Sequence, residues 1–525
     1  MREEREEPLP STYGLSKRIR AKGLLAMEGY SRKAEQDEFS SARVQLEAAV
    51  ERLRSEAVGG LEHGELEELI VEEGREIQRR LMQGHLDLRA ANEAVQKSVQ
   101  GTDEVERSHR RRGVRPLATV VGLVTVLRTA YGARGSSSLC PMDQALNLPV
   151  ELYSHGLRKL AAVEAARGSY EATQEAIERG TGSAVPKRQV EQLVERAAQD
   201  FDSFYLRPDA EVAEAGAEDL LVMSLDGKGI VMRKGDLREE TRKAAAKGQP
   251  KLARRVSRGE KRNRKRMATV AAVYDVAPHP RTPEEVLAEL RPVRDAGKVR
   301  PRARNKRVWA SVEKTPEAVT KEVFDEALRR DPRRKRRWVA LVDGDRHQID
   351  RVRAAARSAG VEVTLVLDLI HVLEHLWKAA WCFFEEGDKR IERWVTERGL
   401  GILQGRSSDV AGGIRRSATL RGLAAADRTG VDECADYLIA KRDLLHYDQY
   451  LPQGLPIATG VIEGACRHLI KDRMDITGAR WSLQGAEAVL RLRSLRSSGD
   501  FHCYWDFHLA HELERNHTSL YAAAA

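Results

Sequence analysis

The chain has 525 residues, of which 32% are charged and 5% aromatic, and its net charge is +9 with a pI near 9.2. This length accommodates several domains of ordinary size. The positive balance favours a polyanionic partner such as nucleic acid, although many basic proteins bind none. No apolar run approaches the roughly 18 residues of a membrane span, and the amino terminus lacks the apolar stretch of a secretion signal. The five dispersed cysteines contain no CxxC pair, which favours a reducing compartment. We therefore expect a cytoplasmic protein without a membrane partner.

A charged helical region is predicted over residues 1–115. The segment GELEELIVEEGREIQRRLMQGHLDLR repeats apolar residues close to helical spacing, as at Leu66, Leu69 and Ile70. This pattern indicates an amphipathic helix that packs or self-associates, rather than a catalytic element. Residues 1–60 carry no motif on which a function could rest.

A β-rich patch followed by a DNA-binding helical region is expected over residues 116–210. LATVVGLVTVLRTAYGARG has branched residues in short runs broken by glycine, which favours strands. Further on, SYEATQEAIERG and PKRQVEQLVERAAQDF read as helices joined by the turn-like TGSAV. Lys187, Arg188 and Gln192 lie on the opening turns of the second helix, where a helix-turn-helix protein presents side chains to base edges. A plain helical bundle is the alternative, because the turn is longer than usual.

Strands dominate the start of the next region, residues 218–370. LLVMSLDG, RMATVAAVYDV and RVWASVEK follow one another without a clear helix between them, which predicts an antiparallel meander. TPEAVTKEVFDEALRRD and RHQIDRVRAAARSAG then read as helices that separate WVALVDGD from VEVTLVLDLI, the pattern of parallel pairing. Beyond residue 371 we expect helices to about residue 450, and again over 461–497.

A basic arm, residues 233–266, separates the first two predicted strands. Its second half, KLARRVSRGEKRNRKR, includes Arg262, Arg264, Lys265 and Arg266. One interpretation is a solvated loop, which charge runs usually form. The other is an arm that follows DNA phosphates and carries little sequence information.

Three acidic residues stand where catalytic carboxylates would be placed. Asp226 follows the first predicted strand, Asp343 follows the fourth, and Glu463 lies near a helix start after a glycine-rich turn. Neighbouring strands lie about 4.8 Å apart, so two such carboxylates and one from a covering helix can share two divalent cations. A cation pair of this kind stabilises both the attacking and the leaving oxygen in phosphoryl displacement. Oxygen ligands suit Mg²⁺ or Mn²⁺.

Each carboxylate also has a purely structural interpretation. Asp226 with the following glycine is a strong hairpin-turn signal between apolar runs. Asp343 or Asp345 could cap the helix that begins near Arg346, and the spacing from Asp345 resembles a capping box. Glu463 could form a surface ion pair with the residue one turn later, Arg467.

Five motifs follow one another along the chain: DGKGI, VALVDGD, LVLDLIHVLEHLW, GVIEGACRHLIKDRM and ITGARWSLQGAEAVLRLRSL. In this order they resemble bacterial insertion-sequence transposases of the ISKra type, DDE enzymes related to the Mutator-like group. The similarity extends to SLCPMDQALNLP, QDFDSFY and FHCYWDFH, and so spans residues 115–515. It implies an α/β fold with an RNase H-like mixed sheet, a helical insertion over 371–454 and completion of the core over 455–500. A C-terminal tail over 501–525 is then expected.

The resemblance also implies an activity and its residues. Asp226, Asp343 and Glu463 match the catalytic triad that holds Mg²⁺ or Mn²⁺, and Asp368 and His371 match an element that positions the site or contacts the DNA end. The implied function is cleavage and strand transfer at the terminal inverted repeats of a mobile element, with target DNA as second partner. A homo-oligomer in the bacterial cytoplasm, associated with the nucleoid, would carry it out. From residue type, the candidates for holding distorted DNA ends are Arg467, Lys471, Arg473, Arg480 and Trp481.

A competing motif is HVLEH, which fits the H-x-x-E-H pattern of zinc peptidases. His371 and His375 are one helical turn apart and could share a metal ion, with Glu374 as base. The downstream acidic ligand that such a site needs cannot be identified. A structural histidine pair and a non-catalytic DNA-binding regulator are the remaining alternatives.

Overall fold

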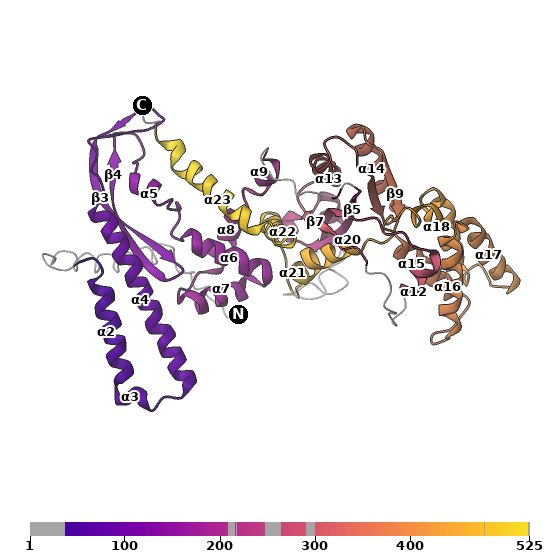
Figure 1. The fold of residues 1–525 in the computed structure, drawn as a ribbon, viewed down its shortest axis with the longest axis horizontal. Helices are drawn as coiled ribbons and strands as arrows, with labels where there is room; N and C mark the ends of the chain where they lie inside the picture. Colours follow the sequence, from indigo (N-terminus) through magenta and orange to yellow (C-terminus); the bar gives the residue numbers. More distant parts are fainter. Residues whose placement is uncertain are drawn as a thin grey trace, which may run out of the picture. The chain divides into compact units, whose positions relative to one another are not determined.

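The computed structural model describes residues 37–207, 216, 218–246, 264–289, 300–476 and 478–522. The chain divides into two compact units. The terminal unit contains residues up to Asp200 together with those from His502 onward, and the central unit contains Phe201–Phe501. Figure 1 labels the helices and strands of both units. Within these described ranges, every helix is too short or too polar to cross a membrane.

The terminal unit begins with α2 (Ser40–Arg54), α3 (Glu56–Gly59) and α4 (His63–Ala91). The amphipathic helix predicted from its apolar spacing is α4, which packs on the other elements through Leu86 and Ala90. The helical region nevertheless ends well before the expected residue 115, since β1 (Val99–Gln100), β2 (Glu106–Arg107) and β3 (His109–Thr119) follow. Strand β3 pairs residue by residue with β4 (Gly122–Gly132), and this pairing satisfies the backbone groups that face β4 despite the charged sequence.

The expected β-rich patch is therefore the β3–β4 hairpin, and helices follow it. Ser154 and Ser169 cap the second and third of them through their side-chain oxygens. Apolar residues of the last helix, including Val190 and Val194, are buried, while its opening turn is exposed. The helices are α5 (Pro141–Ala145), α6 (His155–Arg167), α7 (Tyr170–Thr181) and α8 (Lys187–Ala197), and α9 (Phe201–Leu206) belongs to the central unit.

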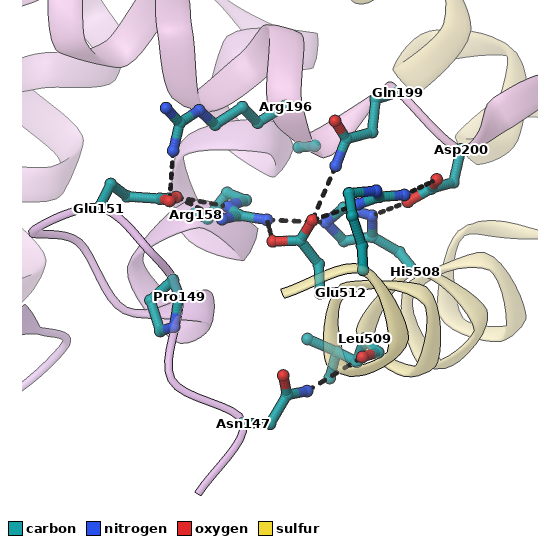
Figure 2. Close-up of polar contacts among 12 residues, drawn as sticks. Asn147, Pro149, Glu151, Arg158, Arg196, Gln199, Asp200, His508, Leu509 and Glu512 are labelled. Carbon is teal, nitrogen blue, oxygen red and sulfur yellow. Dashed lines mark hydrogen bonds and ion pairs between the residues drawn. The ribbon is translucent and has the colours of Figure 1, made fainter. Parts of the chain in front are cut away.

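The C-terminal segment is a packed helix, so the prediction of a tail over 501–525 is wrong. Helix α23 (Phe501–Asn516) places Tyr504, His508 and Glu512 at four-residue intervals on one buried face. Figure 2 shows the polar contacts of this face, which centre on the fully buried Arg158 of α6. An Arg158 guanidinium nitrogen lies 2.6 Å from Glu512 Oε2 and 3.0 Å from His508 Nε2. Further on, η5 (Thr518–Leu520) leads to a hydrogen bond from the Ala522 N–H to the Gln100 carbonyl.

The central unit is built on a five-stranded mixed sheet, as predicted. Its strand order is β7-β6-β5-β8-β9, with antiparallel pairing along β7-β6-β5 and parallel pairing along β5-β8-β9. The antiparallel meander and the later parallel strands are thus confirmed. The strands are β5 (Leu220–Val231), β6 (Lys265–Val276), β7 (Arg304–Ser311), β8 (Trp338–Val342) and β9 (Val363–Leu367).

Helices connect the strands in the predicted order. Both α13 (Pro316–Arg330), capped by Thr315, and α14 (Arg346–Ala359) form where they were expected, and they contact each other beside the sheet (Figure 1). The shorter elements of this part are η1 (Lys234–Asp236), α10 (Glu239–Ala246) and α12 (Pro283–Glu289).

The helices expected beyond residue 371 are also observed, and we refer to this segment as the helical insertion. Figure 1 shows its helices grouped together beyond β9, and α15 contacts α16 and α18. The insertion contains α15 (Leu369–Ala380), α16 (Arg390–Leu403), α17 (Ser407–Leu420), α18 (Thr429–Ala440), η3 (Arg442–Leu444) and α19 (Tyr447–Tyr450). The chain then returns to the sheet through α20 (Gly460–Ala465), the π-helical turn η4 (Cys466–Lys471), α21 (Asp472–Met474) and α22 (Leu483–Ser498). Helix α22 contacts β7.

Candidate active site

The register of two strands places Asp226 and Asp343 at the same edge of the sheet. Strands β5 and β8 pair in parallel up to Ser224 and Leu341, and the two aspartates each lie two residues beyond this last pair. Adjacent strands are about 4.8 Å apart, so both half-buried carboxylates emerge near each other.

Asp226 does not end its strand, and the hairpin interpretation of Asp226-Gly227 is wrong. Strand β5 continues to Val231 and stays paired with β6 throughout, with Asp226 opposite Val270. Only the partnership with β8 ends before Asp226. Asp226 therefore lies where β5 no longer pairs with β8 but is still hydrogen-bonded to β6.

Gln348 of α14 links β5 and β8 just beyond the last residues at which these two strands pair. Its side-chain amide donates to the Leu225 carbonyl at 2.7 Å, and its Oε1 accepts from the Asp343 N–H at 3.3 Å. Asp343 Oδ1 in turn accepts from the Asp345 N–H at 2.9 Å. The positions of both strand ends are thus set by side-chain bonds to backbone groups.

Asp345 is the cap of α14, as predicted. Its carboxylate accepts from the Gln348 N–H at 2.7 Å. The capping box is not closed, because the Gln348 side chain reaches Leu225 and Asp343 instead of the Asp345 backbone. Of the two aspartates in VALVDGD, Asp345 is therefore committed to the helix.

Glu463 lies in α20, and Cys466, the first residue of the following turn η4, joins this segment to the same edge. The buried Cys466 thiol donates to Asp226 Oδ2 at 3.0 Å, and α20 contacts β5 and β6. Burial raises the pKa of Cys466, and the negative charges of Asp226 and Glu463 raise it further. Glu463 is exposed, and its expected ion pair with Arg467 is not formed, because Arg467 faces Asp472 at 3.7 Å.

Asp368 connects the ends of β8 and β9 with α20. It is fully buried; its N–H donates to the Val342 carbonyl at 2.9 Å, and its Oδ1 accepts from the Ile370 N–H at 3.0 Å. Asp368 Oδ2 accepts from His371 Nδ1 at 2.9 Å and from the Thr459 hydroxyl. Because the Thr459 carbonyl accepts from the Glu463 N–H, this network runs from the strand end to the backbone of the first turn of α20.

The two histidines of HVLEH have opposite environments. The hydrogen bond to Asp368 raises the pKa of His371 to about 9, and the charges of Asp368, Glu374 and Asp343 add to this effect. Burial lowers the pKa of His375, whose ring stacks on Tyr437 at a centroid distance of 3.9 Å. The Tyr437 hydroxyl, from α18, donates to the Asp343 carbonyl at 3.1 Å. The helical insertion therefore contacts the site directly.

The donor set suits a divalent cation in type but is not gathered into a closed ligand group. Within the described part of the chain, no three His, Cys, Asp or Glu side chains are close enough together to hold a metal ion. Neither the HVLEH residues nor Asp226, Asp343 and Glu463 form such a group. The three carboxylates nevertheless supply hard oxygen ligands of the kind that Mg²⁺ or Mn²⁺ prefers, from elements that meet at one edge.

The residues predicted to bind DNA divide into exposed and structural ones. Lys187, Arg188 and Gln192 are exposed on α8, where Lys187 pairs with Glu171. In the basic arm, Arg262 lies outside the described residues, Lys265 is exposed and Arg264 is half-buried. The Arg266 side chain instead donates to the carbonyls of Val312 and Asp236, at 2.8 and 3.3 Å, which makes it a structural residue.

The predicted DNA contacts of Arg473 and Trp481 do not agree with their burial. Arg473 is 2% exposed, and its guanidinium lies 4.7 Å from the centre of the Trp481 ring. The Trp481 indole donates to the Met474 carbonyl at 3.0 Å, and its backbone bonds to Val231. The pair fastens the segment before α22 to the end of β5. Arg467, Lys471 and Arg480 are exposed.

Four residues of the site were not singled out from the sequence: Gln348, Tyr437, Thr459 and Cys466. Cys466 follows Glu463 by three residues, so helical spacing could have indicated a shared face. Gln348 was considered only as part of a cap. Tyr437 stands 94 residues from Asp343 and carried no local signal.

Comparison with models of known protein families finds no match, and comparison with curated proteins finds none either.

Proposed function

We propose that this protein is a metal-dependent DDE transposase with an RNase H-like core, which binds the ends of an insertion sequence, cuts the DNA strand and transfers it to target DNA. The observation that carries the proposal is the parallel register of β5 and β8, which brings Asp226 and Asp343 to one edge. The link from Cys466 to Asp226 adds the helix of Glu463 to the same edge. We further propose that the protein acts as a homo-oligomer on nucleoid DNA in the bacterial cytoplasm.

The strand arrangement supports the RNase H-like part of the proposal. In such enzymes the first aspartate follows the first strand and the second follows the fourth, which requires these two strands to be neighbours. Here Asp226 lies within the first strand, at the point where its pairing with the fourth strand has ended. Counted within the sheet, the order is third, second, first, fourth, fifth, and the helical insertion lies between the second and third carboxylates.

The chain's own residues would act by holding and orienting. Asp226, Asp343 and Glu463 would bind Mg²⁺ or Mn²⁺, which when present supplies activation of water and stabilisation of the leaving oxygen. His371, with its pKa raised to about 9, carries a positive charge at neutral pH beside Asp343 and can attract a phosphate oxygen. Asp368 and Thr459 would keep His371 and α20 in place through their hydrogen bonds.

The test is cleavage of DNA that carries the element's own ends, with Mg²⁺ or Mn²⁺ supplied. Asp226→Asn, Asp343→Asn and Glu463→Gln should each abolish cleavage and leave DNA binding largely intact, because the basic surfaces are unchanged. Asp345→Asn is the matched control, since asparagine also caps a helix well. If two of the three carboxylate variants cut at nearly the wild-type rate, the triad is wrong.

A further inference from the structure

A basic cavity lies at the sheet edge opposite the candidate active site. Its volume is about 420 Å³, and it is found where β8 and β9 begin. Three arginines line it, namely Arg334, Arg336 and Arg337, together with polar positions that include Glu362 and Thr364. The lining includes no residue of the candidate active site and none of the residues predicted to bind DNA.

The loop that carries these arginines has a defined conformation. The buried Asp331 carboxylate accepts from the N–H groups of Lys335 and Arg336, at 3.0 and 2.9 Å, and from the Trp338 indole at 2.9 Å. Arg334 has a left-handed backbone, with φ of +53°, and its N–H donates to the Asp331 carbonyl. The backbone of the loop is thus ordered by one carboxylate, and its cationic side chains remain at the surface.

Most of the positive charge on this loop is not neutralised. Arg333, Arg334, Lys335 and Arg337 are exposed, and none of them forms an ion pair with a carboxylate in the described parts of the chain. Arg336 differs, because it binds Asp275 at 2.6 Å and the carbonyls of Asp219 and Leu220. Against these cations, the cavity lining contains a single acidic residue, Glu362. Arg337 also donates a hydrogen bond to the Gln453 side chain, a neutral partner that does not cancel its charge. Within the described residues, four cations without a carboxylate partner on one ordered loop favour an anionic ligand.

We propose that this cavity binds a phosphate of the DNA backbone. Guanidinium groups match the geometry of phosphate oxygens and bind them in pairs of hydrogen bonds. Strand β8 and Asp343 span five residue steps, about 3.3 Å each, so the cavity lies roughly 16 Å from the candidate active site. A phosphate bound here is therefore distant from the one that is cut. The identification of the polyanion as DNA rests on the proposed function, whereas the phosphate chemistry does not.

The test removes three cations and measures DNA binding by fluorescence anisotropy. The variant combines Arg333→Gln, Arg334→Asn and Arg337→Gln, with asparagine chosen because it tolerates a left-handed backbone. Arg336 is retained because it holds Asp275. The charge-matched control combines Arg43→Gln, Arg54→Gln and Arg167→Gln, whose side chains are 62%, 72% and 60% exposed in the terminal unit. The probe is a random-sequence duplex titrated at several salt concentrations.

We expect the cavity variant to bind the duplex at least about ten-fold more weakly than the control at low salt. Each lost phosphate contact should reduce the slope of log affinity against log salt by about 0.9, so the loss of the single phosphate in the cavity should lower the slope by about 1. Restoring charge with Arg334→Lys and Arg337→Lys should recover most of the affinity. Equal slopes for the cavity variant and the control, with equal melting temperatures, would overturn the proposal.

Inorganic phosphate distinguishes a DNA site from a small-anion site. One outcome would overturn the assignment to DNA: the wild-type protein binds inorganic phosphate through Arg334 and Arg337, but the variant binds the duplex as strongly as wild type. The cleavage assay separates this inference from the proposed function. If the wild-type protein cuts DNA and the cavity variant binds DNA as the control does, only the phosphate site in the cavity is refuted. If the cavity variant binds the duplex more weakly but the wild-type protein never cuts DNA, only the transposase activity is refuted.

Discussion

The Cys466 thiol donates a hydrogen bond to Asp226 Oδ2 across 3.0 Å, between a helix and a strand that are 240 residues apart in sequence. The raised pKa of the buried thiol keeps it protonated at neutral pH, so it remains a donor. The other carboxylate oxygen, Oδ1, accepts from the Gly227 N–H at 2.6 Å, so both oxygens of Asp226 are oriented by a donor. Cys466 is thus a positioning residue for Asp226.

Replacing Cys466 tests this positioning. Cys466→Ala removes the donor, so we expect half-maximal cleavage to require several-fold more Mg²⁺, while Cys466→Ser, which keeps a donor, stays close to wild type. Metal titrations of the cleavage rate provide the measurement, with Cys503→Ala at an exposed cysteine of the terminal unit as control. Identical metal requirements for the alanine variant and wild type would refute a positioning role.

Asp343 and Asp345 should respond differently to the same change. Asp345→Asn preserves a good cap and should retain most cleavage, whereas Asp343→Asn should retain almost none. Asp345→Ala should cost about 0.5–2 kcal/mol of stability, because Gln348 then loses the acceptor for its N–H. Cleavage rates at saturating metal, with melting temperatures alongside, make the comparison. An inactive but folded Asp345→Asn together with an active Asp343→Asn would place the second catalytic residue at 345.

The raised pKa of His371 should make the stability of the protein depend on pH. Its folded pKa is raised above the ordinary value of 6.5 to about 9, so its contribution is fully present below pH 6.5 and is lost as pH rises through 9. The full shift would correspond to about 3 kcal/mol. Because 39% of the side chain is exposed, screening by solvent reduces this to about 1–2 kcal/mol.

The measurement is urea unfolding of wild type and His371→Gln between pH 6 and pH 10. The stability difference between the two proteins should be largest at pH 6 and should nearly vanish at pH 10. His347→Gln, at an exposed histidine of α14, is the control and should show no such trend. A difference that stays constant over this range would show that His371 is not bound as an imidazolium to Asp368.

The buried arginine of the terminal unit should be essential for its stability. Arg158→Ala removes the fully buried cation of Glu512, which then keeps only the partly exposed Arg515, and breaking a buried pair costs about 3–5 kcal/mol. Calorimetry should show a lowered transition for this unit, and truncation before His502 should have at least as large an effect (Figure 2). Arg167→Ala, an exposed arginine on the same helix, is the control. An unchanged transition in Arg158→Ala would contradict the account of α23 as a structural helix.

Helix α8 should contribute sequence discrimination. Changing Lys187, Arg188 and Gln192 together to alanine should reduce the preference for terminal-repeat over random DNA by about ten-fold or more, because each lost base contact costs about 1–3 kcal/mol. Competition binding with both DNAs gives the ratio. Arg179→Ala, at the end of the preceding helix, controls for general loss of positive charge. An unchanged ratio would favour the plain helical bundle.

Local sequence patterns determined much of this architecture. The alternation of apolar runs and amphipathic segments was sufficient to predict where the five strands and the helices α13 and α14 lie along the chain. Such patterns reflect backbone preference and burial over only a few residues. The cap at Asp345 was predictable for the same reason, since a capping side chain bonds to a backbone group only three residues away.

Only the tertiary structure decided what depends on register and on distant partners. The sequence Asp226-Gly227 is a turn signal, yet Asp226 lies in the middle of β5 and pairs with β6. Sheet pairing here outweighs a two-residue turn signal. Arg473 and Trp481 read as exposed DNA ligands, yet they bury each other. FHCYWDFH reads as part of a tail, but its polar face meets Arg158 across the fold. Arg158 and His508 are 350 residues apart, and in all three cases the contact depends on how distant elements pack, which no local pattern encodes.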